Sequence, residues 1–362
     1  MGRVRSDKTD ILNSRTCYKS ERLIMKRIKW LMLWCVLCLA AVCTACNGTS
    51  GKTDDKITIV CTNFALYDWT SQLLGDSEAE VILLPNNGTD MHSFQPSAEE
   101  LIQIADCNLL VHVGGESDAW LMDALEANPN EDRIVVNLME VLSRELKEEA
   151  YTEGMQTEHV HADGSVCEEE HDHSGHGEEE ASAYAMDEHI WLSLRMAVKA
   201  CDAIEEALCQ VLPEEEVQIH TNGEAYSAEL VALDQKYMEA VMNSEHSGVL
   251  IMADRFPFIY MMEDYGIEYY AAFPGCSTES EADFETVVFL AEKVKECDVD
   301  TILITESGTN TLADAVAENA GAEGKNIAIL HSMQVVYNSE IEAGASYLEY
   351  MESNLEVLKQ AL

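Results

Sequence analysis

The chain has 362 residues, is 47% hydrophobic and carries a formal net charge of −45. The apolar content excludes a disordered chain, and so acidic a surface excludes nucleic-acid binding, because it repels phosphate and attracts cations. This length predicts about two domains.

The first 46 residues differ from the rest, because they carry nine basic and only three acidic side chains. A basic segment that begins at Met25 precedes the apolar run 30–42, which is too short to span a bilayer comfortably but suits a signal sequence. Residues 43–46 then resemble a lipoprotein signal box that ends at Cys46, although Cys43 stands where leucine is usual. We therefore predict a leader over 1–46 with Cys46 as the lipidated residue. A single-pass anchor is the alternative, and either Met1 or Met25 is the true start.

After a polar linker over residues 47–56, short apolar segments alternate with helical ones. Continuous apolar strands separated by helices indicate a parallel sheet that is covered on both faces. Ser97 and Glu100 form a capping-box pattern, which predicts that a helix begins there. Four strands are predicted in this first half, at residues 57–62, 79–84, 108–113 and 133–138.

The segment 158–188 is acidic and rich in histidine, and it has neither helical nor strand periodicity. It is predicted to be a solvated loop that forms a loose, weaker metal station. The histidines of this predicted station are His159, His161, His171, His173 and His176.

Beyond this loop, a helical stripe over 190–211 stops at Pro213, and a long amphipathic segment follows. The strand–helix alternation then restarts, with strands at 248–253, 267–273, 300–305 and 326–330 and a final helix at about 341–358. We predict an α/β protein with two (βα)4 lobes whose parallel sheets are joined by a long rigid linking helix. The predicted boundaries are 57–213 for the first lobe, 214–246 for the linking helix and 247–362 for the second lobe.

Three histidines stand where strands end or where the lobes meet. His92 follows a predicted strand, His189 precedes the stripe helix, and His331 follows the last strand. Ligands of open α/β sheets gather beyond the carboxyl ends of the strands, and neutral imidazole suits Zn²⁺. This placement makes a shared metal site of His92, His189 and His331 a hypothesis. The alternative is that each is an ordinary surface or core histidine, and spacing alone does not decide between the two.

The segment GTDMHSFQPS, the downstream GGESDAW and the segment DEHIWLS resemble the solute-binding lipoproteins of zinc and manganese ABC importers. The resemblance covers nearly all of residues 57–362. It implies an extracytoplasmic, lipid-anchored, monomeric protein that is not an enzyme. Such a protein captures Zn²⁺ in a cleft between its lobes and delivers it to a membrane permease and its ATPase.

The sequence departs from this family in the second lobe. Ala253 stands where the family has a histidine or carboxylate, so the neighbouring Asp254 is the expected replacement. His331 stands where the family has a late aspartate, and Glu306 occupies a glutamate position near the cleft. The expected ligands are His92, His189, His331 and Asp254, with Glu306 as a second candidate for the fourth ligand.

Other functions stay open at this point. A manganese- or nickel-binding relative and a surface adhesin that buffers metal would both fit the same residues. A zinc hydrolase fits less well, because the sequence has no H-E-x-x-H and no G-x-S-x-G motif.

Overall fold

The computed structural model describes residues 56–84, 88–156, 186–244, 248–277, 282–321 and 325–362. Lys56–Leu362 forms one compact unit. Within the described residues, no helix is long and apolar enough to cross a membrane. The predicted leader, Cys46 and the five histidines of the loop station lie outside the described residues.

The first sheet has four parallel strands in the order β2-β1-β3-β4. Its strands are β1 (Thr58–Cys61), β2 (Glu80–Leu83), β3 (Leu109–His112) and β4 (Ile134–Asn137). Its helices include α2 (Phe64–Leu74), α3 (Ala98–Asp106), α4 (Ala119–Ala127), α5 (Leu138–Val141) and α6 (Leu194–Val211). Three short 3₁₀ turns accompany them: η1 (Met91–Ser93), η2 (Glu116–Asp118) and η3 (Ile190–Leu192). The capping box at the start of α3 is present as predicted.

The second sheet repeats this arrangement, with four parallel strands in the order β6-β5-β7-β8. Its strands are β5 (Val249–Phe256), β6 (Glu268–Pro274), β7 (Thr301–Ile304) and β8 (Asn326–Ile329). Its helices are α8 (Ile259–Tyr265), α9 (Phe284–Glu296), α10 (Asn310–Asn319), α11 (Asn338–Glu342) and α12 (Tyr347–Ala361). The predicted fold class, two four-stranded parallel sheets, is thus confirmed.

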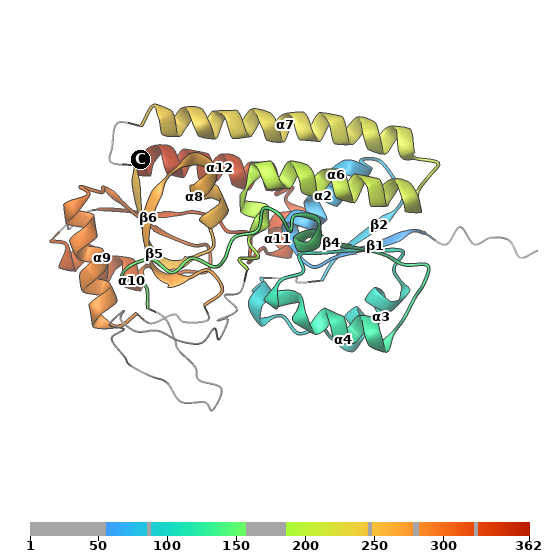
Figure 1. Ribbon diagram of the computed structural model, residues 1–362, viewed down its shortest axis with the longest axis horizontal. Helices are drawn as coiled ribbons and strands as arrows, with labels where there is room; N and C mark the ends of the chain where they lie inside the picture. The colour runs from blue at the N-terminus through green and yellow to red at the C-terminus, as the bar shows by residue number, and fades with distance from the viewer. Residues whose placement is uncertain (1–55, 85–87, 157–185, 245–247, 278–281, 322–324) are drawn as a thin grey trace, which may run out of the picture. The chain divides into compact units, whose positions relative to one another are not determined.

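The long helix α7 (Glu216–Met242) connects the two halves and runs past α6 and α12 (Figure 1). The single final helix predicted at about residues 341–358 is instead two helices, α11 and α12. Gly344 has a φ of +95°, a left-handed conformation that interrupts the helix between α11 and α12. Ser346 then caps α12 by accepting a hydrogen bond from the backbone of Glu349.

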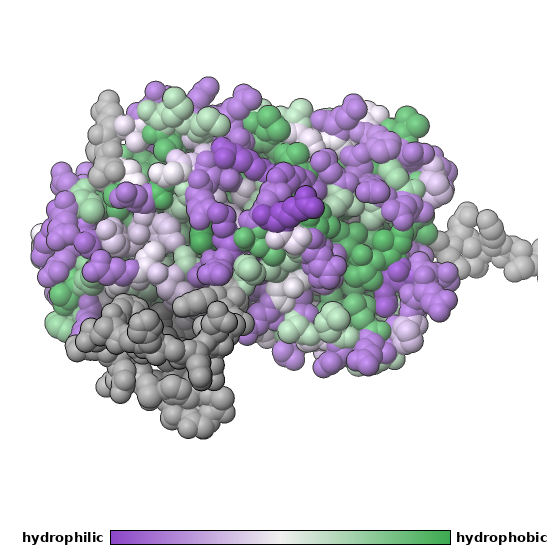
Figure 2. All heavy atoms as spheres, in the orientation of Figure 1, coloured by the Kyte–Doolittle hydropathy of each residue, from purple (hydrophilic) through white to green (hydrophobic). Residues whose placement is uncertain are grey.

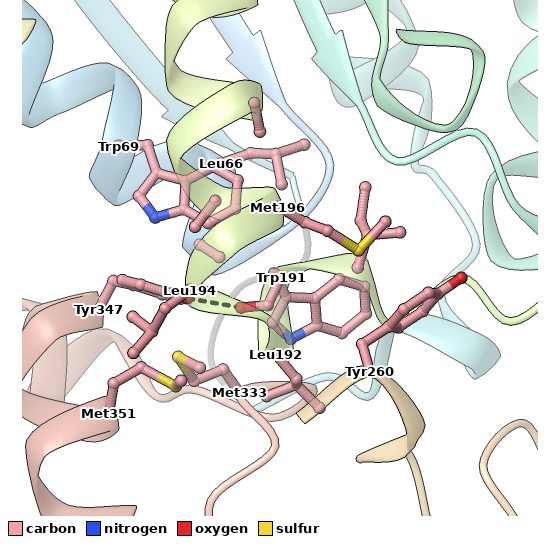
Figure 3. Packing of buried hydrophobic residues seen from close by; sticks show 14 of the residues in the cluster. Leu66, Trp69, Trp191, Leu192, Leu194, Met196, Tyr260, Met333, Tyr347 and Met351 are labelled. Carbon is pink, nitrogen blue, oxygen red and sulfur yellow. Dashed lines mark hydrogen bonds between the residues drawn. The ribbon is translucent and has the colours of Figure 1, made fainter. Parts of the chain in front are cut away.

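One hydrophobic core joins residues of both sheets. Trp191 lies in it, and its indole donates to the backbone oxygen of Ser332 at 2.8 Å. Tyr347 donates to the backbone oxygen of Trp191 at 2.6 Å (Figure 3). These bonds fix the segment after His189 against the loop after β8 and the start of α12. The surface outside this core is largely hydrophilic on the face shown (Figure 2), as the acidic composition predicts.

Candidate metal centre

His92 lies in the loop after β2, where Asp90 caps the short turn η1. The Asp90 carboxylate accepts the backbone N–H of His92 at 3.0 Å. The Nδ1 atom of His92 lies 2.7 Å from the hydroxyl of Ser117 and 3.1 Å from Oε1 of Glu188. Ser117 in turn donates to Glu188 at 2.5 Å. The Nδ1 side of the ring is therefore held by a chain that ends on a carboxylate.

His189 has no exposed surface, and it is held in the same way. The Asp187 carboxylate accepts the backbone N–H of His189 at 2.9 Å and lies 3.1 Å from its Nδ1 atom. Burial opposes protonation of this ring, but the charge and hydrogen bond of Asp187 outweigh it and raise the pKa of His189. Burial likewise opposes the charge of Glu188, but the hydrogen bond of His92 and the charges of both histidines lower the pKa of that carboxyl to about 2.

The two imidazoles point their Nε2 atoms at each other, 3.3 Å apart. A carboxylate at each Nδ1 favours the tautomer that carries its proton there and leaves Nε2 free as a ligand. Two nitrogens on a tetrahedral zinc ion, each at about 2.0–2.1 Å from it, lie about 3.3 Å apart. The pair therefore has the spacing that zinc requires, and its Nδ1 partners favour the tautomers that zinc requires.

Two side chains of the second half complete this group. Cys276 follows β6, and its Sγ atom lies within 4.8 Å of a ring nitrogen of both His92 and His189. Gln334 follows β8, is 3% exposed, and places its Nε2 atom 2.8 Å from Nε2 of His92 and 2.6 Å from Nε2 of His189. The side-chain amide thus lies between the two imidazoles, where a metal ion would bind.

The structure does not place His331 in this group. Its Nδ1 atom accepts the backbone N–H of Met333 at 3.0 Å, and its ring lies 4.0 Å from that of Tyr350. Among the described residues, the group of possible metal ligands contains His92, His189 and Cys276. Of the three histidines that the sequence analysis selected, the structure brings two together, His92 and His189.

Asp254 and Glu306 are occupied by hydrogen bonds of their own lobe. Asp254 accepts the backbone N–H and the hydroxyl of Thr305 at 2.9 and 2.6 Å, and the backbone N–H of Arg255 at 2.8 Å. Glu306 accepts the backbone N–H groups of Ser332, Gln334 and Val335 and the Ser332 hydroxyl, at 2.7–3.1 Å. Both carboxylates hold loops in place.

The sequence analysis missed Cys276 and Gln334. The position of Cys276 directly after a predicted strand was a usable clue, because ligands gather at strand ends. No such clue pointed to Gln334 in the sequence, because an amide is an uncommon metal ligand and no motif marks this residue.

A cavity of about 280 Å³ leads to His92 between the two halves. Arg255, from β5, crosses it and pairs with Asp90 at 2.8 Å, and the same guanidinium group donates to Ser307 at 2.9 Å. The residue that caps the turn of His92 is therefore also tied to the second half.

Two parallel-sheet lobes joined by one long helix, with facing histidines and a thiol at their junction, define a metal-binding member of the solute-binding protein class. Residues 59–361 match the model of a family described as "Zinc-uptake complex component A periplasmic", and the chain belongs to this family.

The chain is similar to the zinc-binding lipoprotein AdcA of Streptococcus pneumoniae, with 28% identity over 334 residues, 90% of this chain and 60% of that protein. It therefore spans less than two thirds of the length of that relative. It is also similar to the high-affinity zinc uptake system protein ZnuA of Bacillus subtilis, with 26% identity over 339 residues, 92% of this chain and 98% of that protein.

Solved structures share the fold. The zinc-bound ZnuA-like domain of Streptococcus pneumoniae AdcA has a TM-score of 0.63 at 24% identity, and the match covers 84% of this chain and 98% of that one. The metal-dependent lipoprotein YcdH of Bacillus subtilis has a TM-score of 0.66 at 23% identity, and the match covers 85% and 99%.

Proposed function

We propose that the protein captures Zn²⁺ at the junction of its two lobes and delivers it to an ABC permease. The family and the names of its relatives support zinc as the cargo. The observation that carries the proposal is the pair of facing Nε2 atoms of His92 and His189, each ring braced by a carboxylate at Nδ1. No step of this function makes or breaks a covalent bond of a substrate, so the protein acts as a carrier rather than an enzyme.

His92 and His189 are the ligands from the first lobe in this proposal. Asp187 and Glu188 orient them, as outer carboxylates do for zinc-bound histidines. His331, Asp254 and Glu306 act instead as supports of the second lobe, because their acceptor atoms already receive hydrogen bonds.

The remaining parts of the proposal concern the cellular setting. Residues 1–46 direct the chain out of the cytoplasm, and Cys46 carries the lipid anchor. Residues 57–213 and 247–362 are the two lobes, and 214–246 is the linker. The partners are the permease and its ATPase, and the protein acts as a monomer. The histidines of 158–188 collect metal weakly.

Calorimetric zinc titration tests the proposed ligands. A zinc site is worth about 10–16 kcal/mol, so each of four ligands contributes about 3 kcal/mol, or roughly 100-fold in affinity. His92→Ala and His189→Ala should each weaken the tight site by at least that factor. The matched control is His220→Ala, which removes a surface histidine that pairs with Glu205. Tight zinc binding by both first-lobe variants would refute the assignment.

A further inference from the structure

We propose that Cys276 is the metal ligand of the second lobe and that its thiolate makes the centre select thiophilic cations, Zn²⁺ and Cd²⁺, over Mn²⁺. This inference rests on the proposed function, since it names the class of cargo that the same site accepts. Neither the family model nor the names of the relatives specify a cysteine.

The distances support a shared metal ion. The Sγ atom of Cys276 and the ring nitrogens of His92 and His189 all lie within 4.8 Å of one another. In a tetrahedral zinc site with Zn–S of about 2.3 Å and Zn–N of about 2.0 Å, sulfur and nitrogen lie about 3.5 Å apart. A small side-chain movement therefore brings the thiol to bonding distance.

The loop that carries Cys276 is built to approach His189 closely. A side chain at the preceding Gly275 would place its Cβ atom 3.0 Å from Cε1 of the His189 ring and 3.0 Å from the backbone oxygen of Phe256. Contacts that short are rare in proteins, so glycine is what allows the loop to pass beside the ring. The backbone at Gly275, and not only the Cys276 side chain, therefore lies close to the His189 ring.

A segment from the first half holds the loop from the other side. The carboxylate of Glu149 accepts the backbone N–H of Cys276 at 2.9 Å. Nearby, the backbone N–H of Gln156 donates to the backbone oxygen of Ala272 in β6 at 2.9 Å. Cys276 is a free thiol, so its sulfur is available to a metal ion.

The oxygen ligands expected in the second lobe are engaged elsewhere. Asp254 accepts three hydrogen bonds, and Glu306 accepts four. Moving either carboxylate to a metal ion would leave backbone N–H groups without partners, at about 1–3 kcal/mol each. By contrast, the Sγ atom of Cys276 donates a weak hydrogen bond to Glu188 at 3.8 Å. Moving this sulfur to a metal ion therefore takes no acceptor from a backbone N–H group.

The chemistry of the set then determines the cargo. When the metal binds, the thiol loses its proton to solvent and the sulfur forms the metal bond, while the two imidazoles bind as neutral ligands. Thiolate and imidazole suit Zn²⁺ and softer cations, whereas Mn²⁺ prefers carboxylate, carbonyl and water oxygens. The amide of Gln334 supplies the fourth position once it turns its oxygen toward the metal.

Cobalt substitution tests the sulfur ligand directly. Purified protein loaded with Co²⁺ should show an intense thiolate-to-cobalt charge-transfer band in the near ultraviolet. Cys276→Ser should abolish this band, and the control Cys297→Ser, at a partly buried cysteine remote from the site, should keep it. A wild-type protein that binds zinc tightly without this band would overturn the inference and leave the proposed function intact. Absence of tight zinc binding would instead refute the proposed function.

A measurement on the wild-type chain guards against a variant that fails to fold. Zinc should protect Cys276 from alkylation by iodoacetamide, as mapped by mass spectrometry, and Mn²⁺ at the same concentration should not. Equal labelling of Cys276 with and without bound zinc would contradict its role as a ligand.

Competition between metals tests the selectivity. Cys276→Asp replaces the sulfur by oxygen and should lower the preference for Cd²⁺ over Mn²⁺ by at least about tenfold. The affinity ratio follows from titrating each metal against a chelator of known affinity. An unchanged ratio in the folded variant would show that Cys276 does not set the cargo.

Discussion

Both lobes place carboxylates near their junction but use them differently. In the first lobe, the carboxylates of Asp187 and Glu188 face the Nδ1 atoms of His189 and His92. In the second lobe, the carboxylate of Glu306, after β7, receives N–H groups of the loop after β8. The first-lobe carboxylates therefore orient histidine rings as well as backbone groups, whereas the contacts of Glu306 are mainly with backbone N–H groups.

This difference shows what decides whether a residue can bind metal. Backbone N–H groups that lack other partners take up the acceptors nearest to them, because an unpaired buried donor is costly. In the first lobe, the Nδ1 atom of each histidine has a carboxylate partner. This favours placing the ring proton at Nδ1 and leaves Nε2 available to bind a metal ion. The predictions below test this contrast, in order of the expected effect on zinc affinity.

Removing charge beside the first-lobe histidines should have the largest effect. We expect Asp187→Asn to weaken zinc binding roughly 10–100-fold, because an outer carboxylate fixes the tautomer and raises the basicity of the ligand. Calorimetric titration with a competing chelator measures this. The matched control is Asp254→Asn in the second lobe, for which we expect no more than about a threefold change. Equal losses in both variants would remove the contrast between the lobes.

The Gln334 amide should have the next largest effect on zinc affinity. Gln334→Leu should weaken zinc binding by roughly tenfold, because it removes a neutral oxygen ligand while keeping the side-chain volume. Gln334→Glu should bind at least as tightly as wild type, since it presents a charged oxygen at the same place. Stronger zinc binding by the leucine variant would mean that the amide only obstructs the site.

The ion pair between Arg255 and Asp90 should affect the rate of release. It joins the second lobe to the residue that caps the turn of His92, and both side chains are mostly buried. We expect Arg255→Leu to speed zinc dissociation about fivefold, which corresponds to about 1 kcal/mol for such a pair. Stopped-flow mixing with excess chelator measures the rate. Arg255→Lys, which keeps the charge, should recover part of the loss.

His331 should have the smallest effect on zinc and a clear one on stability. His331→Ala should change zinc affinity by no more than about twofold but lower the free energy of unfolding by about 1–2 kcal/mol, because it removes packing and a hydrogen-bond acceptor. Urea denaturation measures the second effect. A loss of zinc binding comparable to that of His189→Ala would restore His331 as a ligand.

The pH dependence of the same residue gives a signed test. Burial lowers the pKa of His331 below its ordinary value of 6.5, against the charges of Glu306 and Glu340. The unfolded chain then binds a proton that the folded chain rejects, so His331 lowers stability as pH falls through 6.5. His331→Ala should reduce this acid sensitivity. An equal slope in both proteins would show that the ring titrates normally.

Sequence patterns were sufficient for the fold because apolar strands and capped helices are local features. Local motifs at strand and helix ends also selected His92 and His189, whose Nε2 atoms the fold brings 3.3 Å apart. The second lobe could not be predicted in this way. Whether Asp254 is free depends on Thr305, and whether Glu306 is free depends on the course of residues 332–335, so only the folded chain determines these contacts.

X-ray absorption at the zinc edge tests the central claim most directly, because it counts the atoms bound to the metal. For protein loaded with one equivalent of Zn²⁺, the account predicts one sulfur at about 2.3 Å together with nitrogen and oxygen ligands at about 2.0 Å. The sulfur should disappear in Cys276→Ser while two imidazoles remain. A shell of nitrogen and oxygen alone in the wild-type protein would contradict the account.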